Sequence, residues 1–176
     1  MIDMTSDWAA VIEFPAMHVG IRIAGDVLSA ITYLPRSTPL RAPQDGLSER
    51  AARQIERYRD EPDADFDLPL AQSGSTLRRA VWKEISAIPR GRTRTYGDLA
   101  ARIGMGDASN PRLVGQACGD NPFPIVVPCH RVVAANGLGG FSHHTRGFLI
   151  EAKTWLLRHE SLPLDAEPGT LWHQPA

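Results

Sequence analysis

The fold of the second half of the chain is indicated by residues 95–119, which read TYGDLAARIGMGDASNPRLVGQACG. Thr95, with Asp98 three residues later, matches a capping box and predicts a helix that begins there. Asn110 followed by Pro111 predicts the start of a second helix, because proline at the first helical position loses no hydrogen bond. Two short helices joined by a turn are typical of a helix-turn-helix, which places its second helix on DNA.

The sequence on either side extends this pattern. Residues 76–88 and 148–159 each place apolar side chains on one helical face, so both are predicted to be helices. Residues 125–127 predict a short apolar strand, and residues 131–141 predict a hairpin around Asn136-Gly137, a dipeptide that suits a type I′ turn. Helices followed by a hairpin predict a winged-helix-like domain.

The first half predicts a smaller domain of another kind. Residues 17–34 predict a β-hairpin and residues 47–58 an amphipathic helix, which is followed by an acidic, proline-containing linker. The predicted fold class is therefore α/β, of the α+β kind. It comprises an N-terminal β-sheet domain (residues 1–75), a helical DNA-binding domain (residues 76–161) and a surface tail (residues 162–176).

Composition excludes several classes of protein. The chain has 176 residues, of which 43% are hydrophobic and 22% charged, as in ordinary globular proteins. No apolar run approaches the roughly 18 residues that cross a bilayer, and residues 1–14 contain no Lys or Arg, unlike a signal peptide. Two cysteines are too few for a secreted disulfide scaffold. These features predict a cytoplasmic protein without membrane association.

The net charge of −1 hides an uneven distribution. Residues 1–75 carry a net charge of −5, residues 76–131 one of +5 and residues 132–176 one of −1. A local positive field is what a polyanion such as DNA requires, although two halves of a protein can also simply balance each other. The charge pattern is compatible with DNA binding and does not establish it.

The reactive side chains gather at Pro128-Cys129-His130-Arg131. A thiol reacts as its thiolate, and a basic neighbour such as His130 or Arg131 lowers the thiol pKa. Adjacent side chains on an extended chain point to opposite faces, so His130 requires a bent backbone or a bridging water to act on Cys129. It would also need an acid to orient it. A free cysteine alone is more often a small buried apolar residue, and this is what we expect of Cys118.

Residues 121–133, NPFPIVVPCHRVV, resemble the active-site signature of the O6-alkylguanine-DNA alkyltransferases, also called methylated-DNA–protein-cysteine methyltransferases. The resemblance continues upstream at Thr95-Tyr96 and at residues 112–115, and downstream at residues 153–160. It covers residues 77–160, whereas the N-terminal hairpin and helix match only in layout. Because the flanks match as well as the Pro-Cys-His-Arg core, the signal is highly specific.

The resemblance implies a role for each matching residue. Cys129 is expected to be the alkyl acceptor, His130 the base that draws the thiol proton through a water, and Glu160 the carboxylate that orients this histidine. Asn121 is expected to pin the hinge before the active site. Tyr96 is expected beside the flipped base, where its hydroxyl is the candidate proton donor to the leaving guanine.

The resemblance also implies a DNA-binding surface and a substrate pocket. Arg112 is expected to fill the gap that a flipped nucleotide leaves in the duplex. The other expected DNA-binding residues are Tyr96, Pro111, Arg94 and Arg131. The residues expected to line the pocket are Tyr96, Cys129, Val132, Phe141 and Ser142. From the sequence alone, Arg90, Arg92 and Arg94 suit either phosphate contacts or an ordinary solvated face.

The implied activity is DNA repair by stoichiometric transfer of the alkyl group from O6-alkylguanine to Cys129, with O4-alkylthymine as a second candidate substrate. The expected partner is double-stranded DNA; no cofactor, no metal and no obligate protein partner are expected, and the protein should be a monomer. Cys118, Cys129, His130 and the pair His143-His144 lack the spacing of zinc ligands. The chain departs from many family members at Ser142–Gly147, which leaves the shape of the pocket open.

Two other functions compete with repair. A non-catalytic lesion-binding module, like the alkyltransferase-like proteins, would have a similar shape, but those proteins lack the acceptor cysteine. A cysteine hydrolase could use Cys129, His130 and Glu160. This reading leaves the helix-turn-helix and Arg112 unexplained, and it predicts multiple turnovers on an ester or a peptide.

Overall fold

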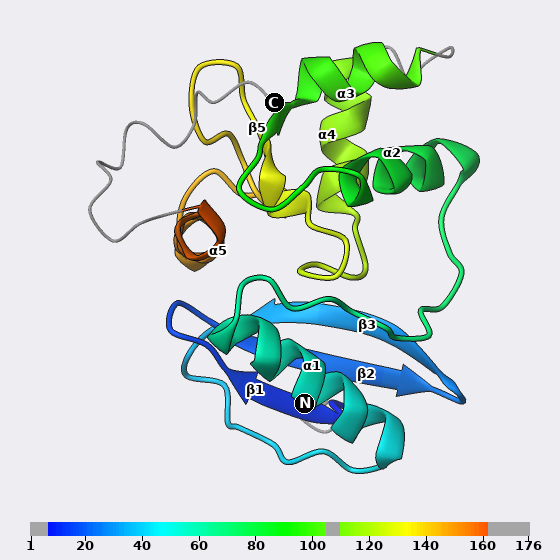
Figure 1. Ribbon diagram of the computed structural model, residues 1–176, viewed down its shortest axis with the longest axis vertical. Helices are drawn as coiled ribbons and strands as arrows, with labels where there is room; N and C mark the ends of the chain where they lie inside the picture. The colour runs from blue at the N-terminus through cyan, green and yellow to red at the C-terminus, as the bar shows by residue number, and fades with distance from the viewer. Residues whose placement is uncertain (1–6, 105–109, 162–176) are drawn as a thin grey trace, which may run out of the picture. The chain divides into compact units, whose positions relative to one another are not determined.

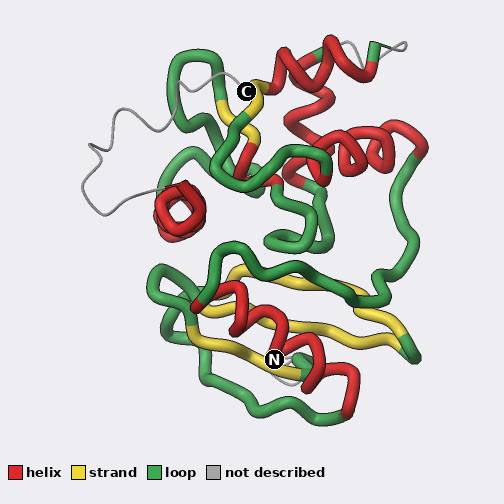
Figure 2. Tube along the Cα trace, in the orientation of Figure 1, coloured by secondary structure: helices red, strands yellow, loops and turns green. Residues whose placement is uncertain are grey.

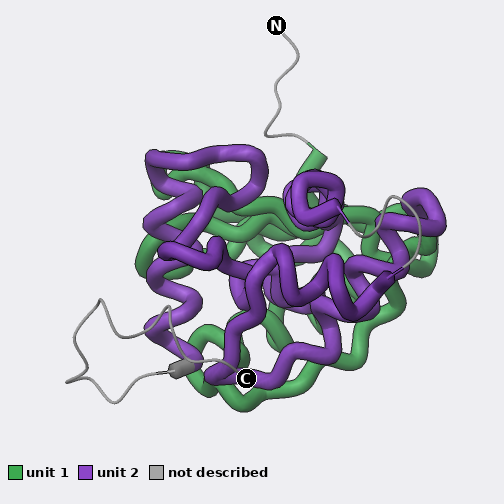
Figure 3. The backbone as a smooth tube through the Cα atoms, turned by 90° about the horizontal axis from the view of Figure 1, so that it is seen from above, with its two compact units in different colours: residues 1–72 green, residues 73–176 purple. Residues whose placement is uncertain are grey.

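The structure is a computed structural model that describes residues 7–104 and 110–161 (Figure 1; Figure 2). The chain divides into two compact units, residues 1–72 and 73–176 (Figure 3). The predicted surface tail, residues 162–176, lies outside the described residues. Each unit has its own secondary structure and its own core.

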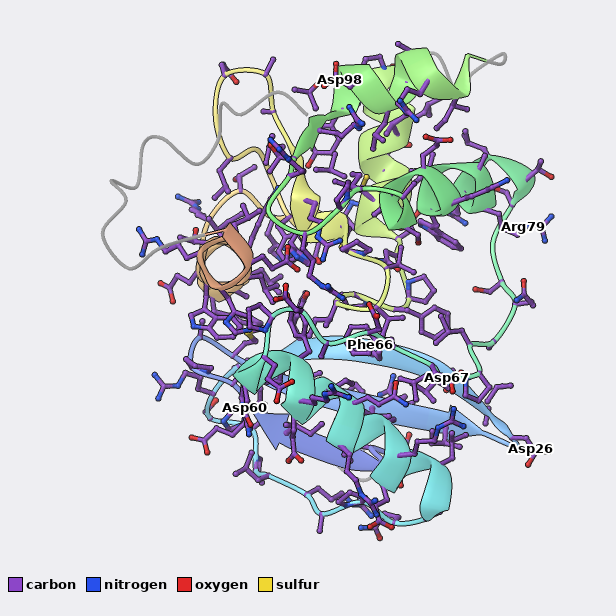
Figure 4. The ribbon with its side chains drawn as sticks, viewed as in Figure 1. Asp26, Asp60, Phe66, Asp67, Arg79 and Asp98 are labelled. Atoms are coloured by element: carbon purple, nitrogen blue, oxygen red, sulfur yellow. The ribbon has the colours of Figure 1, made fainter. Side chains whose placement is uncertain are left out.

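The first unit contains a three-stranded antiparallel sheet in the order β1-β2-β3, with strands Ala10–Glu13, His18–Ala24 and Val27–Leu34. The predicted hairpin is confirmed as β2 and β3, and Gly25 takes a positive φ of 60° at the turn. Asp26 marks the tip of this turn (Figure 4). Strand β1 was missed because three successive buried residues replace the alternation that marks a half-exposed strand.

Helix α1, Gly46–Asp60, crosses one face of this sheet (Figure 1) and confirms the predicted amphipathic helix. Its buried side includes Ile55 and Tyr58. The acidic linker after α1 is held to the first unit by specific contacts. The carboxylate of Asp67 pairs with Arg50 at 2.7 Å, and Leu28 of β3 exchanges backbone hydrogen bonds with residues 69 and 71.

The second unit contains the four predicted helices: α2 (Thr76–Ser86), α3 (Tyr96–Ile103), α4 (Pro111–Gly119) and α5 (Phe148–Ser161). Helices α2, α3 and α4 pack against one another. The pair α3 and α4 corresponds to the predicted helix-turn-helix; its connection, residues 105–109, lies outside the described residues.

The ends of these helices follow the local signals in the sequence. Thr95 accepts from the backbone N–H of Asp98, whose side chain accepts from the N–H of Thr95, so the predicted capping box is present. Figure 4 shows Asp98 at this end of α3. The side chain of Asn110 caps α4. Helix α2 is capped by Ser75, whose side chain accepts from the N–H of Arg78.

The strand predicted at residues 125–127 is wrong, and the predicted hairpin is reduced to a tight turn closed by a single antiparallel bridge between Ala134 and Gly137. Residues 125–127 form turns, with Ile125 at a φ of 74°. Strand β5, Val132–Val133, pairs in parallel with β4, Arg94–Thr95, instead of folding back on itself. The buried ammonium of Lys153 takes the carbonyls of Val132 and Leu138 that a hairpin partner would use. The chain from residue 134 to α5 is therefore an irregular loop (Figure 2).

Candidate active site

The chain between α4 and the reactive cysteine is held by Asn121. Its side-chain N–H donates to the carbonyl of Val127 at 2.8 Å, and its side-chain oxygen accepts from the N–H of Phe123 at 2.9 Å. These two bonds close the turn in which Ile125 takes its left-handed backbone. The turn delivers Pro128 and then Cys129 at a fixed position after α4.

Cys129, His130 and Arg131 form one turn of 3₁₀ helix. This is the bent backbone that the sequence required, because in a strand the side chains of Cys129 and His130 would point to opposite faces. Cys129 is 4% exposed and His130 is fully buried. The reactive residues therefore lie in the interior of the second unit.

Glu160, near the end of α5, binds both residues that follow Cys129. His130 Nε2 lies 2.8 Å from Glu160 Oε1. The Arg131 guanidinium donates to the two carboxylate oxygens at 2.7 and 2.8 Å and to the carbonyl of Ile88 at 2.6 Å. The Glu160 side chain is 1% exposed, so this is a buried, charge-assisted network.

The charges of this network fix the state of the histidine. Burial alone would raise the pKa of Glu160, but the hydrogen bonds from His130 and Arg131 and the charge of Arg131 lower it well below its usual range, so the carboxylate is ionised. Burial lowers the pKa of His130, which is therefore neutral. An ionised carboxylate can only accept, so Nε2 carries the proton and Nδ1 keeps its lone pair. Nδ1 has no hydrogen-bond partner among the described residues.

Burial also raises the pKa of the Cys129 thiol, and Asn121 and Lys153 oppose this rise in part. The expectation that the basic neighbours lower this pKa is therefore wrong. Arg131 is paired with Glu160, and His130 carries no charge. The resting residue is a thiol, so a reaction at its sulfur must include removal of the proton.

A cavity of about 640 Å³ opens at Cys129. Its lining comes from α3, from α4 and from the loop before α5, and it includes Tyr96, Arg112, Cys118, Phe141, Ser142 and His143. Four of the five expected pocket residues therefore line it. Val132 does not: it is fully buried in β5.

The expected DNA-binding residues do not share one environment. Pro111 and Arg112 are exposed in the first turn of α4, and Arg112 also lines the cavity. Arg94 is half-buried in β4. The expected DNA contact of Arg131 is corrected by the structure, because its buried guanidinium is bound to Glu160 and to the Ile88 carbonyl.

Lys153 is a residue of the site to which the sequence analysis gave no role. Its ammonium is fully buried and donates to the carbonyls of Val132, Leu138 and Gly140 at 2.7, 2.9 and 2.9 Å. The Gly140 carbonyl also accepts from the Tyr96 hydroxyl at 3.2 Å. The available signal was a charged residue at a position where the helical spacing of α5 places core residues.

No group of three or more His, Cys, Asp or Glu side chains within residues 7–104 and 110–161 is placed to hold a metal ion. Cys118 is a free, buried thiol, as expected. In the same ranges, no helix has the length and hydrophobicity to cross a bilayer.

The fold and the site define a class of protein with a helix-turn-helix-like pair of helices and a buried cysteine at a cavity. Residues 76–162 match the family model described as "6-O-methylguanine DNA methyltransferase, DNA binding domain". The methylated-DNA–protein-cysteine methyltransferase of Methanosarcina acetivorans is 36% identical over 148 residues, which cover 80% of this chain and 90% of that protein. A probable methyltransferase of the same name from Acanthamoeba polyphaga mimivirus is 47% identical over 53% of this chain and 58% of the viral protein.

Solved structures agree with the sequence relatives. The O6-methylguanine methyltransferase of Mycobacterium tuberculosis superposes with a TM-score of 0.70 at 34% identity, over 88% of this chain and 94% of that one. The structure of Mycobacterium tuberculosis OGT in complex with DNA gives a TM-score of 0.69 at 35% identity, over 85% and 90%. The chain belongs to the methylated-DNA–protein-cysteine methyltransferase family.

Proposed function

We propose that this protein repairs O6-alkylguanine in double-stranded DNA by transferring the alkyl group to Cys129, once per molecule. The observation that carries the proposal is that Cys129 lines the same cavity as Arg112, an exposed cation at the start of α4. A family relative has been solved in complex with DNA. O4-alkylthymine is a second candidate substrate, and action as a monomer in the cytoplasm stays a prediction.

The chemistry is an in-line displacement at the alkyl carbon. The thiol proton leaves through a water to Nδ1 of His130, and Glu160 stabilises the resulting imidazolium. The sulfur then forms a bond to the alkyl carbon as the bond from that carbon to O6 breaks, and the electron pair moves to the guanine. Tyr96, whose pKa is raised by burial, keeps its proton; by turning its O–H away from the Gly140 carbonyl it can donate a hydrogen bond to the leaving base.

The DNA must deform for this reaction. A stacked guanine exposes O6 in the major groove but offers no path along the bond that breaks, so the nucleotide has to leave the helix. Base flipping costs a few kcal/mol, which an inserted side chain can offset. Arg112 is the candidate, since it is both exposed and at the rim of the cavity.

The product is a thioether at a buried position, and no side chain of the site can cleave it. The proposal therefore predicts one alkyl group per protein molecule. It is tested by incubating the protein with a duplex that contains O6-methylguanine, followed by intact mass measurement and peptide mapping. The expected result is one added methyl group on Cys129, in stoichiometric amount, and none in Cys129→Ser.

The competing functions give other results in the same experiment. An unmodified protein that stays bound to the lesion would indicate a binding module. Removal of more than one equivalent of methyl per protein, or multiple turnovers on an ester, would indicate a hydrolase and contradict the proposal. The Cys129→Ser variant should still bind the duplex, because the substitution changes one atom at the base of the cavity.

A further inference from the structure

One wall of the cavity is the loop Ser142–Thr145. Ser142 and His143 take positive φ angles of 48° and 65°, a backbone region that residues other than glycine seldom occupy. Such a backbone persists only where surrounding contacts hold it. The loop therefore needs an anchor outside itself.

The anchor is a contact between His143 and the end of α4. A Cβ atom built on Gly119 would lie 2.4–2.7 Å from three atoms of the His143 ring, so the ring lies against the bare backbone of this glycine. His143 Nε2 lies 3.0 Å from Oδ1 of Asp120, the residue that ends α4. Arg78 of α2 donates to the other oxygen of the same carboxylate.

We propose that His143, held over Gly119 by Asp120, fixes the distance between this loop and α4 and thereby limits the size of the O6 substituent that the cavity admits. This inference rests on the proposed function and assigns a specificity-determining residue to its pocket. The loop and α4 both contribute to the lining of the cavity, to which Cys129 also belongs. A link between the loop and α4 sets how far the cavity can open.

The neighbouring histidine does not provide this link. His144 Nδ1 bonds to the carbonyl of Ser142 at 2.7 Å, and the backbones of His144 and Phe141 exchange two hydrogen bonds, all within the loop. These bonds shape the loop, whereas the contact of His143 reaches another element. Burial would raise the pKa of Asp120, but His143 and Arg78 lower it, so the carboxylate is ionised and available to hold the ring.

The test compares two duplexes of one sequence, with O6-methylguanine or O6-benzylguanine, in single-turnover reactions. The variants are His143→Ala and Gly119→Ala; alanine fits the helical backbone of Gly119, but its Cβ must displace the ring. Each should raise the benzyl-to-methyl rate ratio roughly tenfold, the scale of discrimination that one hydrophobic pocket contact provides. The double variant should give no further increase, because both substitutions break one contact.

Arg78→Ala is the matched control. It removes the other partner of Asp120 but leaves His143 in place, so the rate ratio should stay within about twofold of the parent value. A change of equal size on both substrates, or a fall in the ratio, would overturn the proposal, and additive effects in the double variant would do the same. If the parent protein does not methylate Cys129, the proposed function itself fails; if only the ratio stays constant, only this inference fails.

Discussion

The two units of this protein bury different kinds of side chain. In the first unit, the buried polar residues among those described are His18 and Ser48, and both are satisfied locally: His18 bonds to the Thr38 carbonyl and Ser48 completes the cap of α1. In the second unit, His130, Arg131 and Lys153 are buried, and the Glu160 side chain is 1% exposed. The first interior is thus an ordinary apolar core, whereas the second contains ionisable groups.

This difference indicates that the buried ionisable groups of the second unit are present for the reaction and not for stability. A buried charge is unfavourable unless it is paired, and a well-packed apolar substitute is often at least as stable. The network around Glu160 is therefore expected to be retained for the chemistry of Cys129. Substitutions in the first interior should therefore change stability alone, whereas substitutions in the second should change both stability and alkyl transfer.

The largest effect is expected for Glu160→Gln. The variant leaves Arg131 as a buried, unpaired cation and removes the charge that stabilises the imidazolium of His130. We expect alkyl transfer to fall by more than about 100-fold and the free energy of unfolding to fall by about 3–5 kcal/mol. Single-turnover kinetics measure the rate of alkyl transfer, and denaturant unfolding measures the free energy of unfolding.

The control for that variant lies on the same helix. Glu151→Gln changes an exposed carboxylate in the first turn of α5 and should change neither quantity appreciably. Transfer by Glu160→Gln within about threefold of the parent rate would mean that the buried network is only structural.

Ile55→Ala should show the opposite profile. Ile55 is fully buried in α1, so its truncation should lower the free energy of unfolding of the first unit by about 2–5 kcal/mol. It is not among the residues that line the cavity at Cys129. The rate of alkyl transfer per folded molecule, measured well below the unfolding transition, should be unchanged. A lower rate under those conditions would show that the first unit contributes to the reaction.

Lys153 predicts a pH dependence of stability. Burial lowers its pKa from 10.5 to about 8. Between these values the unfolded chain binds more protons than the folded one, so the free energy of unfolding should rise with pH through this window; below pH 8 both states hold the proton and this contribution stays at its low value. The expected rise is about 3 kcal/mol, at about 1.4 kcal/mol per pKa unit.

The matched variant is Lys153→Met, which cannot titrate. The difference in unfolding free energy between the parent and this variant should shift by about that amount between pH 7.5 and about pH 10.5, whereas contributions from groups that Lys153 does not influence cancel. A constant difference would show that Lys153 has an ordinary pKa and is not desolvated.

The helices of the second unit could be predicted because their signals are local. The capping residues Thr95 and Asn110 act on backbone groups two or three residues away. The strand predicted at residues 125–127 failed for the converse reason. Ile125 is buried in a turn that Asn121 holds, and the apolar run alone does not indicate the hydrogen bonds of Asn121.

The residues of the active site also fall into two groups: those that the sequence could predict and those that only the structure shows. Cys129 and His130 are adjacent in sequence, but their relation depends on a 3₁₀ turn, and Glu160 joins them from α5. The role of Glu160 was predicted from the resemblance to a family; the spacing of the residues alone does not indicate it. Two roles became evident only from the packing. Lys153 is bound by buried carbonyls, and Arg131 binds the Glu160 carboxylate instead of DNA; the groups around a buried cation are not visible in the sequence.

The smallest effect is expected for the N-terminal cap of α3, which lies next to Tyr96 of the cavity. Thr95→Ala removes the side-chain oxygen that accepts from Asp98 N–H, and should lower the free energy of unfolding by about 1 kcal/mol. Thr95→Ser keeps an acceptor and should lose much less. Because Tyr96 is the first residue of α3 and donates to the Gly140 carbonyl, fraying of this end should also slow alkyl transfer slightly, by about threefold or less. A normal rate in Thr95→Ala would show that Tyr96 is held by the cavity lining and not by the helix cap.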